Sequence, residues 1–105
     1  MLEYKIEFDK LEWIERDGGI RDKCIDQNGI RVRLVEYSKE MEPHWCTKAH
    51  YGMILSGLLR VKFKRRSLTF KTGDIVFLPP GDLHKHKAIV VLDPVQVFFI
   101  EPIIK

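Results

Sequence analysis

The stretch from Gly73 to His84 reads Gly-Asp-Ile-Val-Phe-Leu-Pro-Pro-Gly-Asp-Leu-His and decides the fold of this chain. Glycine and proline favour tight turns, so Gly73 predicts one turn and Pro79–Gly81 predict a second. Between the two turns, Ile75 to Leu78 form a short apolar strand. We therefore expect a turn, a strand and a turn, with His84 at the start of the next strand.

The spacing of the two glycines, the proline and the histidine resembles the second conserved motif of the cupin family. Gly73, Pro79, Gly81 and His84 occupy its fixed positions. The chain is therefore similar to small single-domain cupins of the cupin 2 conserved-barrel type. The resemblance implies an all-β fold, the double-stranded β-helix or jelly-roll barrel, and a metal-ligand position at His84.

A variant of the first cupin motif lies upstream, in residues 43–57, and begins with a His-Trp-Cys string. In the family this motif carries two histidines and a glutamate. Here His44 takes the first histidine position, Cys46 replaces the second histidine, and His50 replaces the glutamate. The resemblance thus implies a metal site made of His44, Cys46, His50 and His84.

The remaining sequence predicts short strands separated by turns. Asn28-Gly29 is a strong turn dipeptide. From Ile30 onward, Val32 and Leu34 alternate with two arginines, which predicts a strand with its apolar side facing the core. Glu36 shares the parity of Val32 and Leu34, so we expect it either inside the barrel mouth or in water at the strand end.

One domain accounts for the whole chain of 105 residues. We place the core barrel at about residues 30–101, the part that the resemblance covers, and N-terminal strands within residues 1–29. Tyr4, Ile6 and Phe8 alternate with charged residues and predict the first of these strands.

The chemistry of the candidate ligands favours a transition metal. Residues two apart on a strand share a face, so His44 is expected to face the same way as Cys46, and His86 the same way as His84. Imidazole and thiolate suit Zn²⁺, Fe²⁺, Co²⁺, Ni²⁺ or Cu²⁺ better than Mg²⁺ or Ca²⁺. We expect His44, His50 and His84 to hold one divalent ion, with Cys46 either a fourth ligand or a nearby thiol.

Two classes of function follow from these alternatives. In the first, the chain is a metalloenzyme acting on a small molecule, an oxidoreductase of the dioxygenase type or an isomerase, as the resemblance implies. Such an enzyme needs an open metal position and a general base, for which His86 and Glu36 are the candidates. In the second, His44, His50, His84 and Cys46 close a four-ligand site, and the barrel senses or stores a metal or small ligand without catalysis.

Composition restricts the partners to a small molecule and to other copies of the chain. The chain is 45% hydrophobic and 31% charged, and its apolar runs are too short to cross a membrane. The basic residues from Arg60 to Arg66 lack aromatic residues on their face, so we expect a solvated hairpin and no nucleic-acid binding. Two cysteines, Cys24 and Cys46, without an apolar leader favour the reducing cytoplasm, and Cys24 has no assigned role.

Two rows of alternating apolar residues favour a homodimer. One row runs from Tyr4 to Phe8, and the other runs through Val95, Val97 and Phe99. A two-fold interface would bury such rows.

Overall fold

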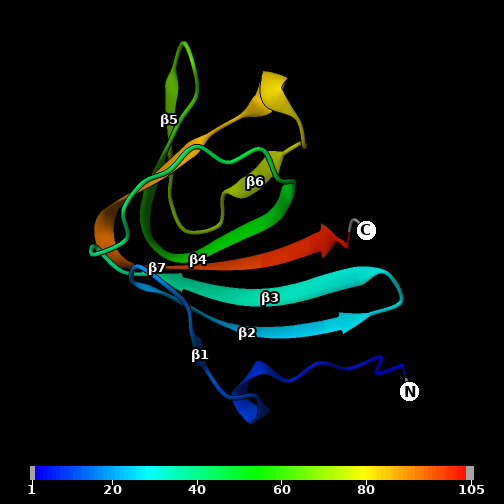
Figure 1. Cartoon of the computed structure of the whole chain (residues 1–105). Helices are drawn as coiled ribbons and strands as arrows, with labels where there is room; N and C mark the ends of the chain where they lie inside the picture. Colours follow the sequence, from blue (N-terminus) through cyan, green and yellow to red (C-terminus); the bar gives the residue numbers. More distant parts are fainter. Residues whose placement is uncertain (1, 104–105) are drawn as a thin grey trace.

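A computed structural model describes residues 2–103, which form an all-β protein (Figure 1). The elements, in chain order, are η1 (Phe8–Lys10), β1 (Ile14–Glu15), β2 (Ile20–Gln27), β3 (Ile30–Tyr37), β4 (His50–Lys62), β5 (Ser67–Phe70), β6 (Ile75–Leu78), η2 (Asp82–His84) and β7 (Lys87–Pro102). The strands form one seven-stranded sheet in the order β1-β2-β3-β7-β4-β5, and β6 pairs with β4. The prediction of an all-β jelly roll is confirmed, including the strand between the two turns.

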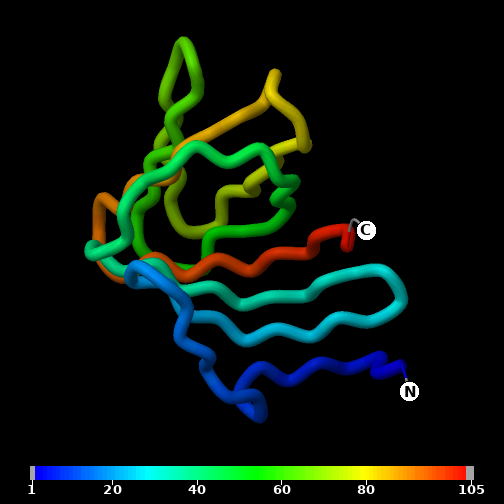
Figure 2. The backbone as a smooth tube through the Cα atoms, in the orientation of Figure 1, coloured from blue at the N-terminus to red at the C-terminus, as the bar shows by residue number. Residues whose placement is uncertain are grey.

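The sheet closes on itself because its two longest strands bend. β4 pairs with β7 over Tyr51–Ile54 and again over Leu58–Lys62, with irregular register between the two segments. Gly57 lies at this bend with φ +84°, and a Cβ there would come within 2.8 Å of the Cα of Val95. The backbone trace in Figure 2 shows both strands turning from the lower layer into the half that holds β5 and β6.

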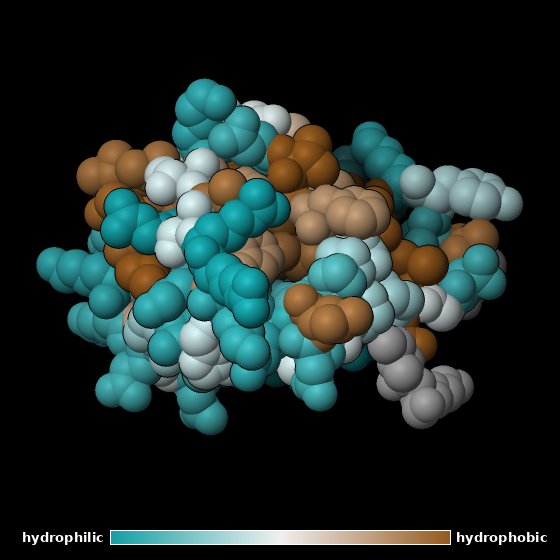
Figure 3. All heavy atoms as spheres, turned by 90° about the horizontal axis from the view of Figure 1, so that it is seen from above, coloured by the Kyte–Doolittle hydropathy of each residue, from teal (hydrophilic) through white to brown (hydrophobic). Residues whose placement is uncertain are grey.

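The surface around the β4–β5 hairpin mixes charged and apolar side chains. Lys64, Arg65 and Arg66 at the hairpin tip are exposed. Seen from above, brown apolar side chains lie between teal charged ones on this end of the molecule (Figure 3). Neither of the short helical segments within residues 2–103 has the length or apolarity to cross a membrane.

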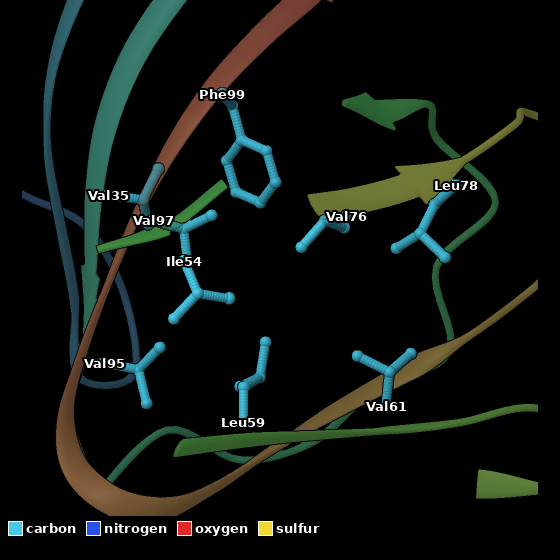
Figure 4. Packing of buried hydrophobic residues seen from close by; sticks show 9 residues of the cluster. All are labelled: Val35, Ile54, Leu59, Val61, Val76, Leu78, Val95, Val97 and Phe99. Carbon is cyan, nitrogen blue, oxygen red and sulfur yellow. The ribbon is translucent and has the colours of Figure 1, made fainter. Parts of the chain in front are cut away.

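The apolar core lies inside the bend and draws on four strands. Side chains from β3, β4, β6 and β7 point toward one another across the barrel (Figure 4). The buried cluster comprises Val35, Ile54, Leu59, Val61, Val76, Leu78, Val95, Val97 and Phe99. Part of this core, including Val61 and Val76, also lines a cavity that polar residues border beside the start of β4.

The face of strand β3 that lies toward the barrel interior is the opposite of the one we predicted. The alternation placed Leu34 and its apolar neighbours inside, but Arg33 faces the interior and Val35 is completely buried there. The outer face is also covered, because Leu34 pairs with Phe98 of β7, and the Phe98 ring packs edge-on against Phe8. Since both faces carry packed side chains, alternation alone could not identify the inner one.

Glu36 follows the parity of Leu34 and therefore lies on the outer face of the sheet. Arg21 donates a hydrogen bond of 2.7 Å to its carboxylate, and Gln96 donates one of 2.9 Å. These three residues are neighbours in register across β2, β3 and β7. The sheet separates Glu36 from the barrel interior, and its carboxylate is largely buried in an ion pair. Neither predicted place, the barrel mouth or water at the strand end, is therefore correct, and the general-base role that needed the barrel mouth is corrected with it.

The two apolar rows predicted to meet in a dimer have other locations. Between Tyr4 and Phe8 no strand forms, and Phe8 instead begins the turn η1. Val95, Val97 and Phe99 are buried in the core of the same chain. The second row is therefore already covered and is not free to form an interface.

Gly52 permits the close approach of β4 and β7, and its replacement by alanine should destabilise the fold. An added Cβ would overlap the carbonyl oxygen of Phe98 and lie 2.8 Å from its carbonyl carbon. We expect Gly52→Ala to lower the free energy of unfolding in urea by about 3 kcal/mol, the upper range for overpacking. The control is Gly18→Ala, where φ is +68° but nothing lies within 4 Å. It should lose only about 1–2 kcal/mol. Equal losses would contradict the steric argument.

Candidate metal site

Three metal-ligating side chains meet beside the start of β4. The donor atoms of Cys46, His50 and His86 all lie within 4.8 Å of one another. His50 is the first residue of β4, whereas Cys46 and His86 form an isolated antiparallel bridge, with backbone hydrogen bonds of 2.8 and 3.0 Å. The bridge fixes the loop before β4 to the segment before β7, so backbone pairing sets the relative positions of the donors.

Hydrogen bonds at the far side of each ring hold both histidines with their other ring nitrogen facing the cluster. His50 Nδ1 contacts a carboxylate oxygen of Glu101, and His86 Nδ1 lies 3.1 Å from the carbonyl oxygen of His84. Since both partners only accept hydrogen bonds, each Nδ1 carries a proton, and Nε2 is the atom that faces Cys46. A protonated Nε2 donates to the sulfur in the metal-free protein, and the same atom binds a metal once that proton is released.

The spacing of the donors fits a metal ion. Cys46 Sγ lies 3.7 Å from His50 Nε2. A tetrahedral ion with ordinary metal–sulfur and metal–nitrogen bonds separates two such ligands by about 3.5 Å. The rings of His50 and His86 are edge-to-face with centroids 5.4 Å apart, so both nitrogens reach the space beside the sulfur.

The electrostatics of the cluster favour a thiolate. Hydrogen bonds from His50 and His86 outweigh burial and lower the pKa of Cys46 to about 5. Burial alone would lower the pKa of His50, but its hydrogen bonds to Cys46 and Glu101 prevail and leave that pKa raised. A deprotonated thiol beside two imidazoles is the donor set that borderline-soft transition metals prefer.

Glu101 and Arg33 form a buried ion pair behind His50. Arg33 Nε and Nη2 donate to the two Glu101 oxygens at 2.8 and 3.0 Å. Burial would raise the pKa of Glu101, but the hydrogen bonds from His50 and Arg33 outweigh it, so this pKa lies below its usual value. The same pairing explains why Arg33 faces the interior, since a buried charge is tolerated when it is paired and hydrogen-bonded.

The cluster opens into a cavity of about 760 Å³. Core side chains such as Val61 and Val76 line part of the cavity, and the exposed residues His44 and Lys48 line its outer part. Tyr37 also lines the cavity, and burial raises the pKa of its phenol to about 12, so it stays neutral. The volume lies within the range of small-molecule sites.

The structure brings together only part of the predicted ligand set. Cys46 and His50 converge as predicted, but His84 lies in the turn η2 and is exposed. His84 was predicted from the resemblance to the second cupin motif, and strand parity placed His86 on the same side. The turn η2 interrupts the strand, so His86 rather than His84 reaches the cluster. His84 contributes its backbone carbonyl, which orients His86. His44 is exposed on the cavity wall and is not among the clustered residues.

Sequence reasoning missed the two charged residues behind His50. Glu101 has the parity of Val97 and Phe99, which the sequence already marked as an apolar row. A carboxylate on the same side of the strand as buried apolar residues indicates that it faces inward and pairs with a buried basic group. Arg33 carried no such signal, because β3 alternates equally well on either face. Neither cysteine forms a disulfide; Cys24 lies on β2 and Cys46 at the site.

Residues 26–98 match the family described as the AraC-like ligand binding domain, and this span is more than half of the chain. The chain belongs to this family. No curated protein sequence matches the chain significantly. Membership covers both motif regions, including the Cys46–His86 bridge, and agrees with the small cupin domain predicted from the motifs.

Solved structures share the fold of this AraC-like domain. An RmlC-like cupin from Shewanella frigidimarina superimposes with a TM-score of 0.78 at 15% identity, covering 99% of this chain and 94% of that one. A putative ethanolamine utilization protein from Salmonella typhimurium gives 0.76 at 15% identity, covering 96% and 86%. KdgF from Halomonas sp. gives 0.71 at 18% identity, covering 90% of both chains. At these identities the likeness establishes the cupin barrel alone.

The low pKa of Cys46 predicts an unusual pH profile of thiol alkylation in metal-free protein. Because the thiol is already ionised above a pH of about 5, its rate with iodoacetamide should stay nearly constant from about pH 6 to 9. Cys24 is the internal control, since burial raises its pKa above the ordinary 9.0, and its rate should climb throughout that range. Cys24→Ser and Cys46→Ser proteins isolate each thiol. A Cys46 rate that rises tenfold per pH unit would contradict the prediction.

Proposed function

We propose that this domain binds one divalent transition metal through Cys46, His50 and His86 and holds a small-molecule ligand against it in the cavity. The observation that carries the proposal is the convergence of three donor side chains, with both Nδ1 atoms bound at the far side of the rings. Zn²⁺, Fe²⁺, Co²⁺, Ni²⁺ and Cu²⁺ all suit this donor set. Compared with the ligand set predicted from sequence, the proposed set has His86 in place of His84 and does not include His44.

The number of protein ligands favours an open site over a closed one. A structural tetrahedral site uses four protein ligands, whereas a site with three leaves a position for water or ligand. A metal bound there would supply Lewis acidity or, for a redox-active ion, electron transfer at the ligand. The cavity beside the three donors is large enough to place a small molecule at that position.

Catalysis of the dioxygenase or isomerase type is the function we favour for this open site. His86 is now a proposed ligand, so neither it nor the outward-facing Glu36 serves as the general base. His44 is the remaining imidazole on the cavity wall, and its exposure leaves it free to exchange protons with water. We propose His44 for this role.

A non-catalytic ligand-binding module is the second candidate. The family description, a ligand-binding domain, favours it directly. Both candidates share the metal and the small-molecule ligand, and they differ in whether the bound molecule changes chemically. Turnover of a bound molecule by the metal-loaded domain would support the enzyme, and its release unchanged would support the binding module.

Metal binding should depend on the three converging residues and not on the other two histidines. Protein purified without added metal and titrated with Co²⁺ should bind one equivalent and develop a sulfur-to-metal charge-transfer band in the near ultraviolet. Cys46→Ser should lose the band, and Ala at His50 or His86 should abolish stoichiometric binding.

His44→Ala and His84→Ala are the matched controls for this titration and should retain it. His84→Ala keeps the backbone carbonyl that orients His86. Loss of binding in His84→Ala with retention in His86→Ala would restore the ligand set predicted from sequence and contradict the one proposed here. Azide added to the cobalt protein should change the spectrum if a coordination position is open.

We also propose that the domain forms a homodimer, through a surface other than the two predicted rows. Ile75 and Phe77 on β6 are 63% and 69% exposed, and Ile100 on β7 is 44% exposed. Tyr51 of β4 lies between Phe77 and Ile100 in the strand register, so these side chains form one continuous apolar face. The location of the protein in the cytoplasm is a separate prediction and stays one.

Light scattering at micromolar concentration should therefore give twice the chain mass of 12.4 kDa. Phe77→Glu should shift the protein to a monomer, because it places a charge in the middle of the apolar face. Leu92→Glu changes another exposed apolar residue at the bend of β7 and should leave the mass unchanged. A monomeric wild-type protein would refute the dimer.

A further inference from the structure

A continuous series of charged side chains runs across neighbouring strands of the sheet, from the half-exposed Arg16 to the candidate metal site. Arg16 donates to the two Asp22 oxygens at 3.2 and 3.0 Å. Arg33 Nη1 lies 3.6 Å from Asp22, and the guanidinium binds both oxygens of Glu101. The Glu101 oxygen that accepts from Arg33 Nη2 also contacts His50 Nδ1.

The strand order explains how this series forms. β2, β3, β7 and β4 are neighbours in the sheet, and they contribute Asp22, Arg33, Glu101 and His50 respectively. Each link therefore crosses from one strand to the next on the inner face. Glu101 of β7 thus contacts the His50 side chain, and Arg33 of β3 binds Glu101 in turn.

The burial of these groups indicates a role beyond stability. Asp22 is 3% exposed and Glu101 is 6% exposed. Taking carboxylates out of water costs free energy that ion pairing only partly offsets, and apolar residues of similar volume are often at least as stable. A row of paired charges leading to one histidine therefore fits the positioning of that histidine better than it fits core packing.

We propose that Glu101 is a positioning residue that holds His50 with Nε2 toward Cys46, and that Arg33, anchored by Asp22, fixes Glu101 in place. This inference rests on the proposed metal function, since its benefit is a ligand oriented before the metal arrives. A carboxylate on the far nitrogen of a ligating histidine fixes the ring and strengthens the donor, and its loss commonly weakens metal affinity 10–100-fold.

The outer face of the same sheet provides a matched control. Arg21, Glu36 and Gln96 form a similar cross-strand cluster on β2, β3 and β7, with hydrogen bonds of 2.7 and 2.9 Å. Glu36 points away from the cavity and touches none of the three proposed ligands. Glu36→Gln therefore removes a carboxylate from an Arg–Glu pair on the outer face of the same sheet without disturbing His50.

The test compares Glu101→Gln with Glu36→Gln in two measurements. In competition with a chromophoric chelator, Co²⁺ should bind the Glu101→Gln protein about 10–100-fold more weakly than wild type, and the Glu36→Gln protein with unchanged affinity. In metal-free protein, NMR should show the His50 Nδ1 proton far downfield in wild type and in Glu36→Gln. This resonance should move upfield or vanish in Glu101→Gln, an effect that a purely structural role would not produce.

Three outcomes decide the proposal. Unchanged cobalt affinity together with an unchanged His50 resonance in Glu101→Gln would overturn it. If wild type itself binds no cobalt, the proposed metal function fails, and the NMR measurement alone decides whether Glu101 orients His50. If Glu101→Gln does not fold, the double variant Arg33→Gln/Glu101→Gln removes both charges together, and the same affinity loss and resonance shift are expected of it.

Discussion

The pairing of β4 with β7 is the constraint on which the rest of this structure depends. It occurs twice, on either side of the bend at Gly57, and so connects the two halves of the barrel. Gly52 allows the strands to approach, because any side chain there would meet the backbone of Phe98. The same pairing sets His50, at the beginning of β4, beside Glu101, near the end of β7. The same strand pairing therefore closes the barrel and brings two residues of the site together.

The barrel interior is divided between two kinds of chemistry. Apolar side chains from four strands form the core and part of the cavity wall, and burial of this surface drives folding. Paired charges, a thiol and two imidazoles border the same cavity beside the start of β4. Buried charges on this scale contribute little net stability, so the apolar core must supply most of it. The domain thus keeps a costly polar site beside a small core.

Much of the fold could be predicted from local sequence, and part of the site could as well. The glycine and proline spacing between Gly73 and Gly81 predicts turns that any fold must accommodate, and the structure has them. Cys46 and His50 could be placed near one another because a motif of known spacing carries them. His86 could not be chosen over His84, because a single turn of 3₁₀ helix between the motif and β7 changes which side chain points inward. The Cys46–His86 bridge that follows this turn joins segments far apart in the chain.

The sequence alone determined the fold class and the presence of a histidine- and cysteine-rich site, since these follow from turn residues and from motif spacing over short distances. Tertiary structure alone decided which face of β3 is inside, because both faces are covered, and burial of Val35 and pairing of Arg33 with Glu101 identify the inner one. It also decided that Glu36 lies outside and that Val95, Val97 and Phe99 belong to the core. The physical reason is common to all three: an alternating strand has two equivalent faces until other strands, distant in sequence, cover one of them.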